Sequence, residues 1–277
     1  MIELERASLD LGSNRVVNEL SLIAERGQVL ALVGPNGAGK SSALRLMSGE
    51  LQPTSGSVRF AGRALGDWDL RELARRRALL SQRSELTFPF RCREVVMLGR
   101  APHFSGRESA SDQRIVHLAM TSTDTLALAD RTYPTLSGGE KQRVDAARVL
   151  AQIWDGTDGR ALLLDEPTAS LDLAHQHLLL GHARSLARER CAVVCVLHDL
   201  NLAAQYADVV AVLDRGKLRA LGVPSEVLDE ALLAEVFQVE AELVTRPGLE
   251  RPLIVIKGAR ASRATPPSQR KEAIHDA

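Results

Sequence analysis

The sequence predicts an α/β fold in which a mostly parallel sheet is flanked by helices. Three short apolar runs carry this prediction, namely VLALV (29–33), ALLLDEP (161–167) and AVVCVLHD (192–199). Each run is rich in Val, Leu or Ala and is followed by apolar residues at helical spacing. Strands that alternate with helices in this way build parallel sheets that are buried on both faces.

The remaining segments complete the expected order of elements. We expect strands over 1–33, a turn and a short strand over 53–63, a helix over 70–77, a buried strand over 78–82, helices and loops over 86–155, and a strand, turn and strand over 209–218. Residues 258–277 are polar and contain prolines, so we expect a disordered tail there.

The composition limits the classes of function. The 277 residues have a net charge of zero and are 45% hydrophobic, so a sizeable core is possible and nothing favours direct binding of a nucleic acid. The longest apolar runs are too short to span a bilayer and the N-terminus is charged, so we expect a soluble, cytosolic protein. Cys191 and Cys195 lie four residues apart in an apolar run. We interpret them as core residues rather than as a redox or metal pair.

The stretch GPNGAGKS (34–41) lies between the first apolar run and a helical pattern that stops at Gly49. Its glycines let the backbone curl with its N–H groups inward, and the following helix adds partial positive charge. Lys40 adds a full positive charge, and Ser41 offers a hydroxyl to Mg²⁺. The spacing G-x-x-x-x-G-K-S is that of a P-loop, which binds nucleotide phosphates. An ordinary glycine-rich turn with a surface lysine is the alternative.

Two adjacent carboxylates end the apolar run ALLLDEP. Asp165, at the end of a strand that faces the P-loop, suits Mg²⁺, directly or through water. Glu166 is the next residue and points in a different direction. Its carboxylate could act as a base that polarises a water for attack on the γ-phosphate. The alternative is an acidic pair at a helix start, which Pro167 and Thr168 also fit.

The stretch LSGGEKQR (136–143) is a second glycine-bearing turn that opens a helix. Ser137 suits the N-cap position and Glu140 follows three residues later, as in a capping box. A plain helix start is one interpretation, and a phosphate site made by Ser137 and the N–H groups of Gly138 and Gly139 is the other. Since one ATP does not need two such loops from one chain, the second loop can serve the ATP of a neighbouring subunit.

Together these motifs resemble those of the ATP-binding-cassette (ABC) ATPases. The resemblance covers roughly residues 1–220 and rests on GPNGAGKS (34–41), Gln82, LSGGE (136–140), LLLDEP (162–167), SLD (170–172) and His198. It implies a P-loop (RecA-like) ABC nucleotide-binding domain with an antiparallel β subdomain and a helical subdomain. The expected single domain spans 1–257, with a catalytic core over 1–85 and 156–225, the helical subdomain over 86–155 and a C-terminal extension over 226–257.

The resemblance also implies a role for each motif residue. The phosphates of ATP would be held by the P-loop residues Gly34, Pro35, Asn36, Gly37, Ala38, Gly39, Lys40, Ser41 and Ser42. Mg²⁺ would be held by Ser41, Gln82 and Asp165. Glu166 would be the general base, with His198 at the γ-phosphate and Gln82 near the attacking water. The ATP of the other subunit in a head-to-tail homodimer would be bound by Ser137, Gly138 and Gly139. Asp172 would join the nucleotide site at the dimer seam.

One position departs from the family pattern. The family places an aromatic residue before the second strand, where it stacks on adenine, whereas LDLGSNRVV (9–17) contains none. Leu11 or Val17 is expected to provide apolar contact instead, which leaves the selectivity for the base open.

The segment TFPFRCREVVMLGRAPH (87–103) resembles the importers of iron complexes, haem and cobalamin. Its FPF element, the stretch AQIWDGTDGRALLLDEP (151–167) and LDLAHQH (171–177) resemble most the haem (hemin) importers. Ferric siderophore and cobalamin are the next candidates for the cargo. The resemblance implies a homodimer that binds two transmembrane permease subunits through 83–107 and works with a periplasmic substrate-binding protein. It also implies a peripheral position on the cytoplasmic face of the bacterial inner membrane, with membrane contact only through the permease. A surface helix is the alternative for 83–107.

Other classes of function remain as alternatives. A non-transport ABC ATPase acting on nucleic acid or ribosomes would need a long coiled coil between the P-loop and LSGGE, or a second cassette, and the sequence shows neither. LSGGE and His198 disfavour a P-loop kinase or GTPase. His175, His177 and His182 lie in one expected helix, but positions i and i+2 lie on different faces. We therefore expect helix-surface residues rather than a haem site.

Overall fold

The computed structural model describes residues 1–82, 86–156, 159–244 and 251–260. Over these ranges the main sheet has the strand order β10-β9-β3-β8-β7-β6, in which only the edge strand β10 runs antiparallel to its neighbour. The strands are β3 Val29–Val33, β6 Arg77–Leu80, β7 Ala161–Asp165, β8 Ala192–Val196, β9 Val209–Asp214 and β10 Lys217–Gly222. Every residue of β3, β7 and β8 is buried. This confirms the predicted α/β fold with strands covered on both faces.

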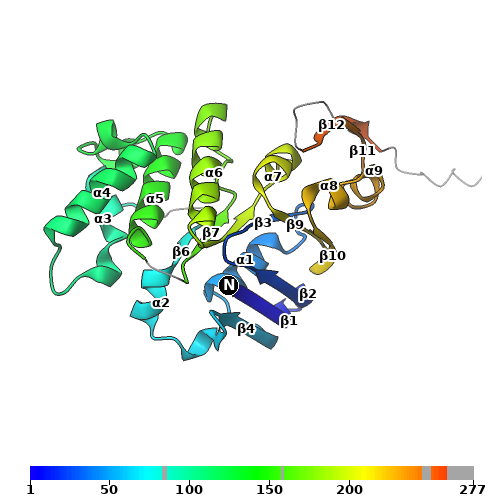
Figure 1. Cartoon of the computed structure of the whole chain (residues 1–277), viewed down its shortest axis with the longest axis horizontal. Coiled ribbons are helices and arrows are strands. Elements are labelled where there is room, and N and C mark those ends of the chain that lie inside the picture. The colour runs from blue at the N-terminus through cyan, green and yellow to red at the C-terminus, as the bar shows by residue number, and fades with distance from the viewer. Residues whose placement is uncertain (83–85, 157–158, 245–250, 261–277) are drawn as a thin grey trace, which may run out of the picture.

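Helices cover both faces of the main sheet (Figure 1). Helix α1 (Lys40–Ser48) packs between the main sheet and a second, antiparallel sheet of order β2-β1-β4-β5. The strands of the second sheet are β1 Ile2–Leu11, β2 Asn14–Ala24, β4 Ser55–Phe60 and β5 Arg63–Ala64. Helices α6 (Leu173–Arg188) and α7 (Leu200–Tyr206) pack on the opposite face of the main sheet.

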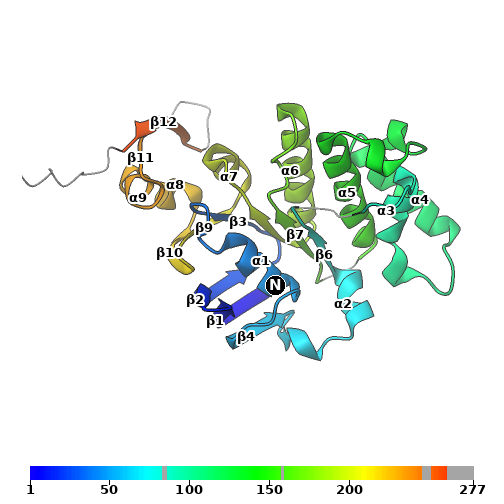
Figure 2. The ribbon, with the colours of Figure 1, turned by 180° about the vertical axis from the view of Figure 1, so that it is seen from behind.

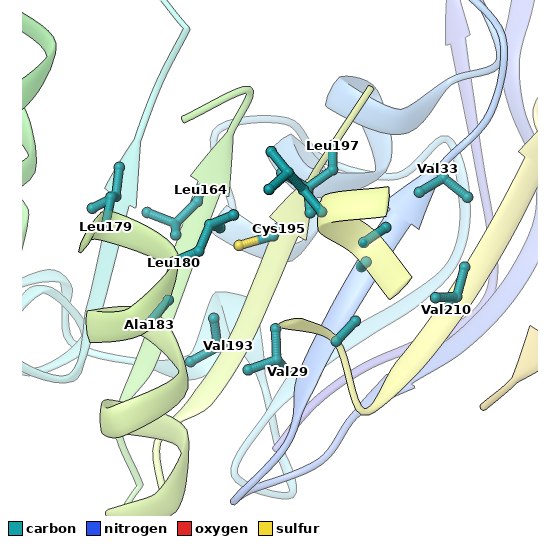
Figure 3. Close-up of a cluster of buried hydrophobic side chains, with 14 of the residues drawn as sticks. Val29, Val33, Leu164, Leu179, Leu180, Ala183, Val193, Cys195, Leu197 and Val210 are labelled. Atoms are coloured by element: carbon teal, nitrogen blue, oxygen red, sulfur yellow. The ribbon is translucent and has the colours of Figure 1, made fainter. Parts of the chain in front are cut away.

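A cluster of buried apolar side chains joins α6 to the main sheet (Figure 3). Leu179, Leu180 and Ala183 of α6 point toward strands β7 and β8, and full burial of a Leu side chain contributes about 1.5–3 kcal/mol. Cys191 and Cys195 belong to the same cluster as buried free thiols, and burial raises the pKa of each to about 12. This confirms that both cysteines are core residues.

A group of helices with its own apolar core lies beside the sheet, as the two opposite views show (Figures 1 and 2). Its helices are α3 Cys92–Leu98, α4 Ala110–Ser122 and α5 Gly138–Gln152. Arg100, which is only 2% exposed, ties them together. Its guanidinium donates to Asp112 at 2.9 Å, to the carbonyl of Ala151 at 2.7 Å and to both carboxylate oxygens of Asp155 at 2.8 and 3.0 Å. A buried charge needs such partners, so these bonds fix the ends of the three helices relative to one another.

Short helical segments connect these elements. They are η1 Leu65–Asp67, α2 Leu70–Arg76, η2 Ala101–His103, η3 Leu126–Leu128 and η4 Tyr133–Thr135. Helix α2 begins and β6 follows where the sequence predicts a helix over 70–77 and a buried strand over 78–82. Among the helices of the described ranges, none combines the length and the apolarity needed to cross a bilayer.

The chain ends in a small unit that packs against α7. It comprises α8 Pro224–Val227, α9 Glu230–Leu232, a π-helical turn Leu233–Phe237, β11 Val239–Val244 and β12 Leu253–Ala259. The sequence did not predict the β11–β12 hairpin. Strand β12 runs through Ala259, so it occupies two positions of the segment expected to be a tail. The part of that segment from 261 onward lies outside the described residues.

Candidate functional site

The loop between β3 and α1 depends on two glycines. A Cβ atom on Gly34 would lie 2.1 Å from the carbonyl oxygen of Leu213, and one on Gly39 would lie 2.5 Å from that of Val16. Gly39 also has a φ of 96°, in the left-handed region that glycine adopts without strain. The loop therefore runs directly against β9 and β2 before α1 begins at Lys40.

Lys40 is the buried cation of this loop, with 5% of its surface exposed. Its ammonium donates to the carbonyls of Gly34 at 2.8 Å and Pro35 at 3.0 Å. Burial lowers the pKa of Lys40, and the nearby carboxylates of Glu166 and Asp165 act in the opposite direction. A buried ammonium whose hydrogen-bond acceptors are neutral carbonyls suits a negatively charged ligand such as a phosphate.

Ser41 and Asp165 meet at the carboxyl end of β7. The Ser41 hydroxyl donates to Oδ1 of Asp165 at 2.9 Å. Burial raises the pKa of Asp165, and the Ser41 hydrogen bond opposes this shift. Hydroxyl and carboxylate oxygens fit Mg²⁺, which usually takes one or two carboxylates and completes its ligand set with water and phosphate. Within the described ranges no cluster of three or more His, Cys, Asp or Glu side chains could hold a metal.

Glu166 lies next to Asp165 in an unusual backbone conformation. Its φ is 49°, a left-handed value that non-glycine residues adopt at a cost of about 1–3 kcal/mol and that occurs often at functional sites. The Gln82 amide donates to Oε2 of Glu166 at 2.6 Å, and Nε2 of His198 lies 2.6 Å from Oε1. Residues from three separate strand ends thus meet at one carboxylate.

A cavity of about 220 Å³ lies beside these groups. It is lined by Val16, Asn36, Gly37, Ala38, Gly39, Lys40, Ser41, Ser42, Glu166 and His198. Asp165 and Gln82 adjoin it through their bonds to Ser41 and Glu166. The cavity therefore brings together most of the residues singled out from the sequence, with Lys40 at its centre.

The apolar contact beside the cavity comes from a residue that the sequence analysis missed. Val17 is 1% exposed and belongs to the core, and Leu11 is 48% exposed and does not line the cavity. The lining residue is Val16. The contact of Leu11 or Val17 with adenine stays a prediction, and the pattern of β2 does not reveal which of two adjacent valines lines this cavity.

The LSGGE turn lies apart from this cavity. Ser137 caps α5 by accepting the N–H of Glu140 at 3.3 Å, and Glu140 accepts the N–H of Ser137 at 2.8 Å, which confirms the predicted capping box. A Cβ atom on Gly139 would lie 2.8 Å from the carbonyl oxygen of Ser170, so the turn packs against the SLD segment. Of the described residues 136–140, none lines the cavity at Lys40.

Asp172 is also distant from the cavity lining and caps α6. Its Oδ1 accepts the backbone N–H of His175 at 3.0 Å and lies 2.7 Å from Nδ1 of the same residue. These bonds, the backbone bond first, lower the pKa of Asp172. His177 contacts Tyr206 and His182 contacts the carbonyl of Ser122, so the three histidines of α6 do not converge.

Comparison with known proteins shows the family to which the chain is similar. The family model described as "ABC transporter" matches residues 17–169. The "Hemin import ATP-binding protein HmuV" of Gloeobacter violaceus is 50% identical over 261 residues, covering 94% of this chain and 95% of the relative. The protein of the same name from Pseudomonas entomophila is 48% identical over 257 residues, covering 93% of this chain and 100% of the relative.

Solved structures share the fold. A chain of a metal-chelate type ABC transporter in an inward-facing conformation has a TM-score of 0.75 at 23% identity, covering 92% of this chain and 96% of that chain. A dimeric ATP-binding cassette bound to ADP and Pi has a TM-score of 0.71 at 24% identity, covering 81% of this chain and 99% of that chain.

Proposed function

Because the chain belongs to the ABC transporter family, whose ATP-binding subunits hydrolyse ATP, we propose that it energises the import of haem. The support for haem is the extent of the similarity to proteins named for hemin import, which spans more than nine tenths of the chain. Ferric siderophore and cobalamin are the competing cargoes. The observation that carries the ATPase proposal is the contact of Glu166 with both Gln82 and His198 beside the cavity that Lys40 lines.

The P-loop residues would hold the phosphates of ATP. Lys40 would exchange its bonds to two carbonyls for bonds to phosphate oxygens, which gains a charged partner for a buried cation. Ser41, Asp165 and Gln82 would hold Mg²⁺, which neutralises phosphate charge when bound. The raised pKa of Asp165 is consistent with this role, because a bound cation would offset the cost of burying its carboxylate.

Glu166 would act as the general base. Its carboxylate would accept a proton from the attacking water, while Gln82 and His198 orient it and contact the water and the γ-phosphate. Both partners already bind this carboxylate at 2.6 Å. Binding of ATP would draw these side chains toward phosphate and water and leave the carboxylate free for its proton.

The active assembly would be a head-to-tail homodimer. Ser137, Gly138 and Gly139 present a capped helix N-terminus outside the cavity at Lys40. That arrangement suits the phosphates of an ATP held by the partner subunit. Asp172 lies beside this turn, since Gly139 packs against Ser170 of the same segment. It would close the seam between the protomers.

The permease would dock on the group formed by α3, α4 and α5. A cavity of about 560 Å³ lies between α3 and α4. Its apolar lining comes from Met97, Leu98, Phe104, Val116, Met120, Leu126 and Ala129. Phe88, which is 68% exposed, lies in the preceding segment. Residues 83–85 of the expected contact region 83–107 lie outside the described residues. Two such dockings would hold the dimer at the cytoplasmic face of the inner membrane, beside a periplasmic substrate-binding protein on the other side.

Reconstitution tests this proposal. The protein and the permease pair encoded beside it are assembled in liposomes, and ATP hydrolysis is measured with haem, ferric siderophore or cobalamin on its binding protein. Stimulation by haem alone supports the proposal. Stimulation by another cargo would replace haem as the proposed cargo and leave the proposed transport mechanism unchanged. A rate of ATP hydrolysis that does not change with the permease or with any cargo would contradict a transport function. It would favour an ATPase that acts on nucleic acid or ribosomes, which a salt-sensitive nucleic-acid pull-down would detect.

A further inference from the structure

One face of α6 contacts the group formed by α3, α4 and α5 through two histidines. His175 and His182 lie seven residues apart and therefore share this face. Nε2 of His182 lies 2.6 Å from the carbonyl of Ser122 at the end of α4. His177 lies on another face, and its Nδ1 is 2.7 Å from the hydroxyl of Tyr206 on α7.

His175 is bound on both of its ring nitrogens. Nδ1 lies 2.7 Å from Oδ1 of Asp172, which caps α6. Nε2 lies 3.0 Å from Nη1 of Arg143 on α5 and 3.4 Å from Oδ2 of Asp124, in the turn after α4. Arg143 in turn donates to the backbone carbonyl of Asp124 at 2.7 Å.

These partners select one form of the ring. An arginine can only donate, and an ionised aspartate can only accept. Both close contacts are satisfied when the neutral ring of His175 carries its proton on Nδ1, which donates to Asp172, while Nε2 accepts from Arg143. A protonated ring would place two donors, Nε2–H and Nη1–H, against each other at 3.0 Å. The remaining acceptor on that side would be Asp124.

We propose that His175 is a positioning residue for ATP hydrolysis, an inference that rests on the function proposed above. In its neutral form it links Asp172, at the expected dimer seam, to Arg143 of α5, the helix that LSGGE opens. It thereby fixes the two segments that would meet the partner's ATP relative to each other. Loss of the bond to Arg143 would leave the ring bound to Asp172 and Asp124 alone.

The surroundings of His175 leave the ring little freedom. The charged and titratable groups that face it are Asp172 at the cap of α6, Asp124 after α4, Arg143 on α5 and His182, which lies seven residues further along α6. The side chains of His175 and Arg143 are 22% and 17% exposed, whereas those of Asp124 and Asp172 are 77% and 67% exposed. The bond between His175 and Arg143 is therefore the more shielded of the contacts that the ring makes.

Three variants test the proposal in the reconstituted complex. His175→Leu is expected to lower kcat about five- to tenfold with the KM for ATP within about twofold, the pattern of a group that acts on the transition state. His175→Gln keeps a donor and an acceptor, so it should retain most of the wild-type kcat. His177→Gln is the matched control and should follow wild type.

A second measurement does not depend on hydrolysis. Ring ¹⁵N shifts of His175 in the full chain report which nitrogen carries the proton, and Arg143→Ala should change them while His177→Gln should not. An Nε2–H tautomer, or a kcat of His175→Leu equal to that of wild type, would overturn the proposal. If the complex hydrolyses no ATP at all, the proposed function fails, and the ring shifts still decide whether His175 joins Asp172 to Arg143.

Discussion

Gln82 and His198 both contact the carboxylate of Glu166, and the Nε2 atom of each lies 2.6 Å from a different carboxylate oxygen. The three residues follow three different strands, β6, β7 and β8, which are neighbours in the parallel sheet. Because the carboxyl ends of parallel strands meet at one edge, residues far apart in the chain converge there.

Glu166→Gln should abolish steady-state hydrolysis, with a loss of about 10²–10⁴-fold. The amide keeps the size of the side chain but cannot accept a proton from water. ATP should remain bound, and the homodimer should be stabilised. Single-turnover hydrolysis and size-exclusion chromatography with ATP measure the two effects. Single-turnover hydrolysis near the wild-type rate would rule out Glu166 as the base.

Asp165→Asn should raise the Tm of the nucleotide-free protein by a few degrees at pH 7.5. Burial raises the pKa of Asp165 above its usual 3.8. Between pH 3.8 and this raised pKa, the folded protein therefore binds more protons than the unfolded chain. Stability is therefore lost as the pH rises through this window. The Tm gain of the variant should shrink as the pH is lowered toward 4, which differential scanning calorimetry would detect. An equal Tm gain at pH 7.5 and near pH 4 would contradict a raised pKa of Asp165 in the folded protein.

The enzyme should discriminate weakly between nucleotide bases. Val16 is the apolar side chain at the cavity, and an apolar contact of this kind does not distinguish adenine from guanine. The kcat/KM values for ATP and GTP should agree within about tenfold, because an apolar contact offers no hydrogen bond that would be lost with the wrong base. Val16→Ala should raise both KM values about three- to fivefold. A preference for ATP above a thousandfold would show that another group recognises the base.

Leu180→Ala should lower the free energy of unfolding by about 2–4 kcal/mol. Leu180 is 1% exposed and packs between α6 and the main sheet (Figure 3), so the change leaves a cavity. Leu178→Ala is the matched control on the same helix, since Leu178 is 38% exposed, and should cost less than about 1 kcal/mol. Denaturant titration followed by circular dichroism measures both. Equal costs would mean that α6 does not pack as described.

Asn201→Ala should cost about 1–3 kcal/mol, because it leaves buried backbone groups without partners. The Asn201 amide donates to the carbonyl of Ile254 at 3.0 Å and accepts its N–H at 2.8 Å, and so bonds the β11–β12 hairpin to α7. Gln205→Ala, an exposed change on α7, is the control and should leave stability unchanged. Hydrogen exchange at Ile254 should quicken in the first variant. Unchanged protection there would show that the hairpin is held by other contacts.

Much of the fold follows from local patterns. The apolar runs at 29–33, 161–167 and 192–199 contain the fully buried strands Val29–Val33, Ala161–Asp165 and Ala192–Val196, because a run without alternation fits a strand covered on both faces. Ser137 and Glu140 formed the expected capping box, whose geometry depends on four consecutive residues. The β11–β12 hairpin was not predicted, although Pro247 and Gly248 between its strands form a dipeptide that is typical of turns.

The sequence by itself determined the phosphate-binding loop, the acidic strand end and the class of chemistry, because each depends on residues that are neighbours in the chain. Only the tertiary structure decided which side chains meet across segments. It placed Val16 at the cavity beside Lys40, and it brought Arg143 to His175. Such contacts depend on how helices and strands pack, and packing is set by the whole core rather than by any short stretch of sequence.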